Sequence, residues 1–566
     1  MRVILVLLSA VALTGCAGAY VGGDVAPAKE AVRETGPYGL FLAGHAALGD
    51  GRAREAEALF ARAAAAAPGN GVVRARAFHA SLAAGDVGRA AAAPLAEVEG
   101  DDQSLARLTR AVDALARGQG KQAHALLTEQ PLSGAHGLTG GLLRPWTAAA
   151  AGNWEEALNP AGADSEARRL VAALGEIGRV DLLERAGRHA EAEALVAGLK
   201  PAEAPVQTVL RQGAYLERRR KGDRAVALYE QALKARPSDL TLQAALRRAR
   251  TGGSPPAAPS LRQGAAQALL VPAVVLAGAQ QTEGALAYLR LALHLDPKMD
   301  EAWVTLGEVL SGQRDLEGAR SAFLKPAPGS PQFAAARARL AYVLQEQGRT
   351  EEALQAAQSA AALAPSELAL QSTYGALLME VGRNDEAVTL FDRLLAKDAA
   401  DDWRTWYLRG TAHERAGRWN DAQRDLQHAL KLAPEEPEVL NYLGYSWVDR
   451  GERLQEALGM IERAVQLRPR SGAIVDSLGW AKYRLGQFEE AVELLERAAE
   501  LEPGDPTIND HLGDAYWRTG RKVEAHFQWR RVLTLEPERE VRAAAETKLA
   551  SAVGPDAVSR AVAVRP

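Results

Sequence analysis

Apolar and polar residues follow the spacing of amphipathic helices along most of the chain, with short breaks between them. The first such stretch, residues 37–70, has apolar residues at helical spacing on both sides of a Gly-Asp-Gly break, and it ends in Pro-Gly-Asn. Two amphipathic segments on either side of so short a break predict a helical hairpin. The hydrophobic pattern therefore predicts an all-α protein built from hairpins.

The same hairpin recurs at a fixed spacing. In its second helix a small residue is followed by an apolar one, another small one and a proline, as in Ala56, Phe60, Ala63 and Pro68. Later copies have Ala422, Leu426, Ala429 and Pro434, and then Ala525, Trp529, Val532 and Pro537. Repeats start at 266, 300, 334, 368, 403, 437, 472 and 506, a spacing of 34 or 35 residues. This period resembles the tetratricopeptide repeat (TPR), which implies a helical-hairpin solenoid wound into a right-handed superhelix.

Four recurring positions have physical reasons within such a repeat. Glycine at the eighth position lets the two helices of a hairpin approach closely, as at Gly307, Gly375, Gly410, Gly444, Gly479 and Gly513. Alanine at the twentieth does the same from the second helix, as at Ala319, Ala353, Ala387, Ala422, Ala491 and Ala525. A turn glycine joins the helices at Gly348, Gly382, Gly417, Gly451, Gly486 and Gly520. Proline ends the second helix at Pro365, Pro434, Pro469, Pro503 and Pro537.

The repeats divide the chain into predicted segments. Eight clear repeats cover 266–539, followed by a capping helix and tail at 540–566. The pattern weakens toward the N-terminus, where 37–250 is interpreted as a degenerate TPR-like array with one good copy at 206–239. Residues 251–262 begin with TGGSPPAAPS, which cannot continue a helix and predicts a linker between two arrays.

One proline interrupts the regular pattern. Pro326 falls inside the expected second helix of the repeat that starts at 300. Because proline lacks an amide hydrogen and clashes with the preceding turn, it should shorten or kink that helix. A shortened helix is the preferred interpretation, and a hinge is the alternative.

The N-terminus predicts export and a lipid anchor. Residues 1–15 combine Arg2 with a short apolar core, which is typical of a signal peptide and too short to span a bilayer. The sequence LTGC ends in Cys16, the single cysteine of the chain, and it resembles the bacterial lipobox, which implies lipidation of that residue. The alternative is an ordinary secretory signal with an incidental cysteine. Residues 16–36 are interpreted as a flexible tether. Ala17 follows the cysteine, in place of the aspartate that commonly retains lipoproteins at the inner membrane of enteric bacteria. The outer membrane is therefore the favoured location.

Composition narrows the function classes. The net charge is -4 from well-mixed signs, so a nucleic-acid partner is not expected. The basic cluster of Arg218, Arg219, Arg220, Lys221, Arg247, Arg248 and Arg250 is interpreted as a solvated helix face. We find no phosphate loop, zinc-protease motif or nucleophile elbow, and the histidines have no metal-ligand spacing. The sequence therefore predicts no enzyme activity, no cofactor, no metal and no small-molecule substrate.

The TPR resemblance also implies where a partner binds. In TPR superhelices, positions 2, 5, 9 and 12 of each repeat face the concave groove. In the last three repeats these positions include Asn441, Tyr445, Val448, Asp476, Trp480, Tyr483, Asp510, Asp514 and Trp517. Aromatic side chains beside Asp and Asn suit protein binding. The alternative is that the aromatics pack between repeats. Since acidic residues replace the basic residues of a carboxylate clamp, a basic or polar segment is the expected ligand.

A closer resemblance suggests a function. The run NYLGYSWVDRGERLQEALGMIERAVQLRP and the two repeats after it resemble the C-terminal repeats of proteobacterial TPR lipoproteins, some of which are adaptors for carboxyl-terminal processing proteases. The resemblance covers roughly residues 266–540 and implies a periplasm-facing adaptor at the outer membrane. The alternative is an assembly factor for a pilus, secretion channel or polysaccharide exporter.

Overall fold

The computed structural model describes residues 36–93, 100–130, 132–159, 178–237, 239–397 and 399–551. All regular secondary structure in these ranges is helical, which confirms the all-α prediction. The described residues fall into two compact units, an N-terminal unit up to residue 377 and a C-terminal unit from residue 378. The predicted signal peptide, Cys16, the tether up to residue 35 and the tail from residue 552 lie outside the described residues.

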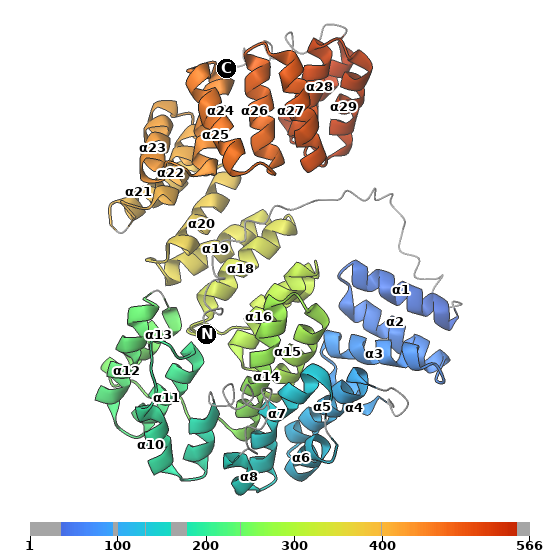
Figure 1. Ribbon diagram of the computed structural model, residues 1–566, viewed down its shortest axis with the longest axis vertical. Coiled ribbons are helices and arrows are strands. Elements are labelled where there is room, and N and C mark those ends of the chain that lie inside the picture. The colour runs from blue at the N-terminus through green and yellow to red at the C-terminus, as the bar shows by residue number, and fades with distance from the viewer. Residues whose placement is uncertain are drawn as a thin grey trace. The chain divides into compact units, whose positions relative to one another are not determined.

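The N-terminal unit is a succession of short antiparallel helices (Figure 1). Its first helices are α1 (Pro37–Gly49), α2 (Ala53–Ala66), α3 (Gly71–Ala84), α4 (Val87–Ala92), α5 (Asp101–Ala116), α6 (Gly120–Thr128), α7 (Gly134–Ala150) and α8 (Trp154–Leu158). After a helical stretch at 178–185 follow α10 (His189–Ala197), α11 (Val206–Arg218), α12 (Gly222–Ala235) and α13 (Leu240–Arg250). The unit continues with α14 (Leu261–Gly278), α15 (Thr282–Leu295), α16 (Asp300–Gly312), α17 (Leu316–Phe323), α18 (Phe333–Glu346) and α19 (Thr350–Leu363). Helix α20 (Leu368–Glu380) contains the boundary between the units.

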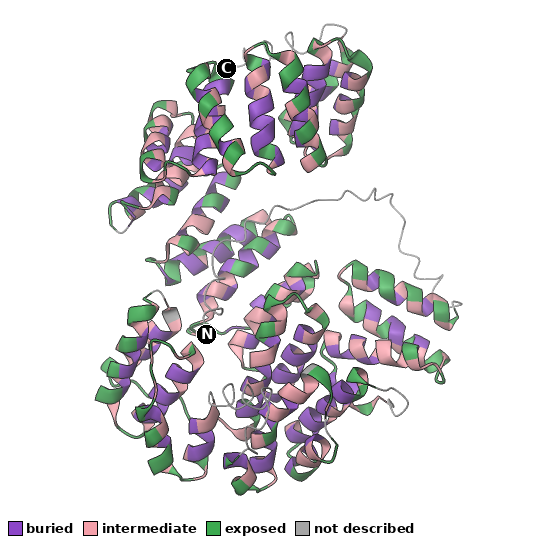
Figure 2. Ribbon diagram, in the orientation of Figure 1, coloured by how far each residue is buried: buried purple, intermediate pink, exposed green. Residues whose placement is uncertain are grey.

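The C-terminal unit is a regular row of hairpins, and Figure 1 shows α24 to α29 side by side. Its helices are α21 (Asn384–Leu395), α22 (Trp403–Arg415), α23 (Trp419–Leu432), α24 (Pro437–Arg450), α25 (Leu454–Leu467), α26 (Gly472–Arg484), α27 (Phe488–Leu501), α28 (Pro506–Arg518), α29 (Lys522–Thr534) and α30 (Arg539–Ala550). Buried residues follow the faces that the helices turn toward their neighbours (Figure 2). Each helix is therefore stabilised mainly by the hairpins next to it.

The repeat positions have the backbone and burial that the pattern predicts. The six turn glycines all have positive φ, between 70° at Gly348 and 81° at Gly520, where a side chain would be strained. The six alanines at the twentieth position are fully buried. Helices α16, α20, α22, α24, α26 and α28 begin at the predicted repeat starts, and α14 begins five residues before its own.

The glycine at the eighth position permits a close helix contact. A Cβ atom added to Gly513 would lie 2.5 Å from the indole of Trp529 in the paired helix, closer than real side chains approach. A Cβ atom added to Gly307 would lie 2.6 Å from the ring of Phe323. Since both aromatic rings are buried, even alanine at either glycine should force the two helices apart.

Helix α17 ends at Phe323, before Pro326, so the preferred interpretation of a shortened helix is confirmed. Its N-terminus is capped by Asp315, whose carboxylate accepts from the amide of Gly318 at 2.8 Å.

Helices far apart in the sequence pack together in the N-terminal unit. Helices α3 and α5 contact α15, and α7 contacts α14. Arg290 of α15 donates to the carbonyl of Ala83 at 2.9 Å, and His136 bonds the hydroxyl of Tyr288 at 2.8 Å. The early helices therefore pack directly on the first clear repeat. By length and composition α14 is apolar enough to cross a membrane, but here it is part of this helix packing.

The predicted linker lies inside the N-terminal unit, because the two units divide near residue 377 and not near 251–262. Residues 252–260 are not helical. Arg218 donates to the carbonyl of Pro256 at 2.9 Å, and Arg185 donates to that of Pro259 at 2.6 Å. Two guanidinium groups thus fix this segment against the helices beside it.

Candidate functional site

The nine predicted groove residues, here called the C-terminal stripe, lie on α24, α26 and α28. Four of them are buried, namely Val448, Asp476, Tyr483 and Asp514, and the other five are partly buried. Burial limits what the first four can offer to a partner. Whether the partly exposed members contact another protein stays a prediction.

The aromatic residues of the stripe pack on one another and on the neighbouring repeat. The ring of Trp480 stacks on that of His511 with centroids 4.1 Å apart, and on that of Tyr483 at 4.8 Å. Tyr483 belongs to a core cluster with Leu495 and Trp529. This packing favours the alternative interpretation for Tyr483, that it joins consecutive repeats.

Asp476 is neutralised from the next repeat. His511 places Nδ1 at 3.0 Å from both of its carboxylate oxygens. Burial alone would lower the pKa of His511, but the Asp476 carboxylate outweighs that effect, with help from Asp510 and Asp514, and raises it. The pair is therefore a buried ion pair whenever the imidazole is protonated.

Asp510 and Asp514 are neutralised by the last helix. Lys548 of α30 donates to Asp510 at 2.7 Å and to Asp514 at 2.8 Å, and Trp529 Nε1 donates to Asp514 at 3.1 Å. Burial raises the pKa of Asp514 to about 6, although Lys548 opposes that shift. Burial alone would lower the pKa of Lys548, but the carboxylates of Asp514 and Asp510 outweigh that effect and raise it. The stripe is acidic by sequence and largely compensated in the structure.

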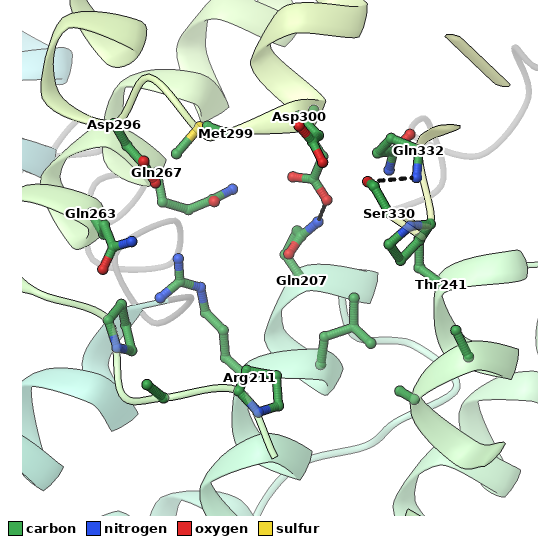
Figure 3. A pocket seen from close by; sticks show the side chains of 18 of the residues that line it. Gln207, Arg211, Thr241, Gln263, Gln267, Asp296, Met299, Asp300, Ser330 and Gln332 are labelled. Carbon is green, nitrogen blue, oxygen red and sulfur yellow. Dashed lines mark hydrogen bonds between the residues drawn. The ribbon is translucent and has the colours of Figure 1, made fainter. Parts of the chain in front are cut away.

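A second candidate site is a cavity of about 390 Å³ in the N-terminal unit, here called the linker pocket. It is lined by side chains of α11, α13, α14 and α16 and by the segments 256–259 and 330–332. Figure 3 shows Gln207 of α11 extending toward Asp300 at the start of α16, whereas Arg211 extends toward Gln263 and Gln267 of α14. The cavity has a mixed lining, in which apolar side chains such as Leu210 and Met299 lie beside charged groups of both signs.

Ion pairs outside the cavity hold both arginines of the linker pocket. Arg211 bonds the buried carboxylate of Asp181, and Arg248 donates two hydrogen bonds to Glu217, at 2.7 and 3.1 Å. The carboxylate of Glu301 accepts from the amide of Gln207. Burial raises the pKa of Glu301, and Gln207 and Arg211 only partly offset it. Among the described side chains, no cationic group forms an ion pair with Glu301.

The basic cluster differs from its prediction at one residue in particular. The Arg218 side chain is only 14% exposed, and it donates to both oxygens of Glu184, so the interpretation as a solvated face is wrong there. Lys221 and Arg250 also pair with acids, Glu193 at 2.5 Å and Glu230 at 2.6 Å. These basic residues hold neighbouring helices together, whereas Arg219, Arg220 and Arg247 are exposed, as the prediction of a solvated face has it.

Three features were missed by sequence reasoning, namely the Asp476–His511 pair, the Lys548 bridge and the linker pocket. A signal existed for the first, because Asp476 and His511 lie 35 residues apart, one repeat along the chain. Within the ranges that the structure covers, no group of three metal-ligating side chains could hold an ion.

Comparisons with known proteins identify the repeats. Models of the tetratricopeptide repeat match residues 276–340, 344–409, 407–472 and 479–520. A TPR repeat-containing protein of Pseudomonas aeruginosa is 34% identical over 91 residues, which are 16% of this chain and 15% of that protein. The match thus spans a small part of that relative's length.

Several solved structures that match part of the chain are described as TPR proteins. A tetratricopeptide repeat protein from Parabacteroides merdae is 16% identical, with 44% of this chain and 97% of that one covered and a TM-score of 0.38. A thermophilic TPR protein of Thermus thermophilus is 24% identical, with 32% and 98% covered and a TM-score of 0.29. YrrB, described as a TPR protein with an unusual peptide-binding site, is 18% identical, with 34% and 99% covered and a TM-score of 0.26.

Proposed function

We propose, on the basis of the tetratricopeptide repeats within residues 276–520, that this chain is a non-catalytic scaffold that binds other proteins. Repeats of this family generally act as protein-interaction scaffolds. The observation that carries the proposal is the regular stacking of hairpins from α22 to α29, which builds an extended surface from many small units.

The proposed place of action is the periplasmic side of the outer membrane. The sequence LTGC and the single cysteine, Cys16, support a lipid anchor. An adaptor that presents substrates to an envelope protease is the favoured role, because the C-terminal repeats resemble those of such adaptors. An assembly factor for an envelope machine is the second candidate.

The anchor is tested by replacing the lipidated residue. Cys16→Ser should leave the protein unprocessed or release it into the soluble periplasmic fraction, because no thiol remains to carry the acyl chains. Membrane fractionation of the tagged wild type and of the variant measures this. Firm membrane retention of a processed variant would contradict the lipobox interpretation.

Partner binding is tested by capture from solubilised envelopes after cross-linking. We expect the full-length chain to retain a small set of envelope proteins. A protease together with cell-wall hydrolases would support the adaptor, and secretin or exporter subunits would support the assembly factor. Capture of nothing above a tag-only control would contradict both.

The same experiment can examine the C-terminal stripe. Trp517→Ala removes a partly exposed aromatic of the stripe, and Phe527→Ala removes one that is 62% exposed on α29, outside the stripe. Truncating a binding hot spot costs about 2 kcal/mol or more, a loss of about thirtyfold or more in affinity. Equal capture by both variants would show that Trp517 does not contact the partner.

A further inference from the structure

The linker pocket brings together groove positions from three repeats. Gln207, Gln267 and Glu301 each occupy the second position of their repeats, which start at 206, 266 and 300. Leu210, at the fifth position of the first of these, also lines the cavity. Elsewhere such positions follow one another along consecutive repeats. Here the segment 256–259 carries the chain past the cavity, so that groove residues from both sides of the predicted linker face one space.

The charges in this cavity are unbalanced. The arginines that line it are held by Asp181 and Glu217, as described above. Asp300 makes no side-chain hydrogen bond or ion pair with any other described residue, and it lies next to Glu301, whose one bonded partner is a neutral amide. Two adjacent carboxylates therefore face a partly enclosed space without an ion pair to either arginine of its lining, an arrangement that favours a cationic ligand.

The remaining lining suits a long side chain that ends in a positive charge. Leu210, Met299 and Pro256 supply apolar surface for an aliphatic stem, and Gln267 supplies an amide oxygen that can accept a hydrogen bond. A cavity of about 390 Å³ lies within the range of sites that take up small groups.

We propose that the linker pocket takes up a lysine or arginine side chain from an extended segment of a partner protein, with Glu301 and Asp300 as its counter-ions. The inference rests on the proposed function as a protein-binding scaffold, and it assigns one chemical class of contact to a defined place in the chain.

Methionine methyl signals can test the pocket directly. The chain has four methionines, of which Met299 lines the cavity and Met460 lies in the C-terminal unit. The full chain, labelled with carbon-13 at the methionine methyl groups, is titrated with acetyl-Gly-Arg-Gly-amide. Met299→Leu assigns the reporting signal. We expect a saturable shift of Met299, with a Kd in the millimolar range for so short a peptide, and none of Met460.

Matched probes distinguish charge from shape. The citrulline peptide, which has nearly the same shape but no charge, should shift Met299 little. Putrescine, a free diamine, is the competing source of the same cationic group. A shift with putrescine and none with the arginine or lysine peptide would overturn the partner-segment proposal, and equal shifts with arginine and citrulline would overturn the counter-ion roles.

Variants complete the test. Glu301→Gln keeps an acceptor for Gln207 but removes the charge, and it should raise the Kd of the arginine peptide about tenfold. Asp300→Asn should act in the same direction. Glu346→Gln changes an exposed acid of the same unit outside the cavity and should leave the Kd unchanged. Thermal melts establish that each variant is folded.

Failure of the two proposals can be told apart. Envelope capture by the full chain with no Met299 shift for any cationic peptide would overturn the pocket inference alone. A charge-dependent Met299 shift with no captured protein would uphold the cation site and contradict the scaffold function.

Discussion

The C-terminal stripe and the linker pocket both place carboxylates at groove positions, yet their charges are balanced in opposite ways. In the stripe, His511 and Lys548 come from the next repeat and from the last helix to neutralise Asp476, Asp510 and Asp514. In the linker pocket, the arginines are bound by other acids, and Glu301 faces the cavity with an amide partner.

The comparison separates structural charge from charge that is available to a ligand. A carboxylate whose counter-ion comes from the same chain mainly holds helices together, because a partner would have to displace that counter-ion. A carboxylate without one keeps its attraction for a partner. The two regions should therefore respond differently when their charges are removed.

The largest effect is expected at Lys548. Lys548→Met leaves Asp510 and Asp514 partly or fully buried without their cation, and it should lower the free energy of unfolding of the C-terminal repeats by about 3 to 5 kcal/mol. Hydrogen exchange of peptides from α28 to α30 in increasing urea measures this. Lys431→Met, at an exposed position of α23, is the control. Equal stability of the two variants would show that the acids of the stripe are not held by Lys548.

A somewhat smaller loss is expected at Tyr483. Tyr483→Ala removes a ring that is 8% exposed and packed between repeats, and it should cost about 3 kcal/mol of stability. The exposed Phe527 serves as the control, since Phe527→Ala should leave the melting temperature nearly unchanged. An unchanged melting temperature for Tyr483→Ala would indicate that this residue faces a ligand and does not join consecutive repeats.

The His511–Asp476 pair should make the stability of the C-terminal unit depend on pH. The pKa of His511 is raised above 6.5 in the folded chain, so the pair contributes stability fully below about pH 6.5 and loses it as the pH rises through the higher folded pKa. The free energy of unfolding of the C-terminal unit should therefore decline as the pH rises over this range.

Urea unfolding at several pH values from 6 to 9 measures that dependence. In Asp476→Asn the imidazole loses its counter-ion, so the decline over this range should flatten while overall stability falls. If the stability of the variant declines with pH as much as that of the wild type, groups other than His511 cause the decline.

The smallest effect is expected in the linker pocket. There, removing a charge should stabilise the chain slightly, whereas the substitutions in the stripe destabilise it. The pKa of Glu301 is raised above 4.5 in the folded chain. Its ionisation therefore destabilises the folded chain as the pH rises from 4.5 through the folded pKa. Glu301→Gln should therefore be neutral or more stable by less than about 1 kcal/mol at pH 8. Thermal melts at pH 8 and pH 4 measure this difference. A clear loss of stability at pH 8 would indicate that an unrecognised cation within the chain holds Glu301.

Much of the fold was predictable because the residues that determine the packing of each hairpin lie within a single repeat. Glycine and alanine at fixed positions, such as Gly513 and Ala525, define helix contacts within a single hairpin. The turn glycines and terminal prolines mark where helices end. These signals recur every 34 or 35 residues, so helix starts could be placed to within one residue for most repeats.

The sites were less predictable because their contacts cross between repeats. The groove register identified Asp510 and Asp514 but could not show that Lys548, on a helix outside the repeat pattern, pairs with both. The linker pocket depends on how residues 251–260 pass between α13 and α14, and no periodic signal reports that path. Proline and glycine in this segment indicated only that the helix ends.

The packing of α3, α5 and α7 on α14 and α15 has a consequence for how the chain acquires its structure. Arg290 and Ala83 are 207 residues apart, and Tyr288 and His136 are 152 residues apart. Closing such loops is entropically costly, and folding slows as contacts become more distant in sequence. During synthesis, the early helices emerge long before α15 does, and the faces that will meet it stay exposed to water. The N-terminal unit should thus fold late and depend on chaperones, whereas the C-terminal hairpins can fold one after another.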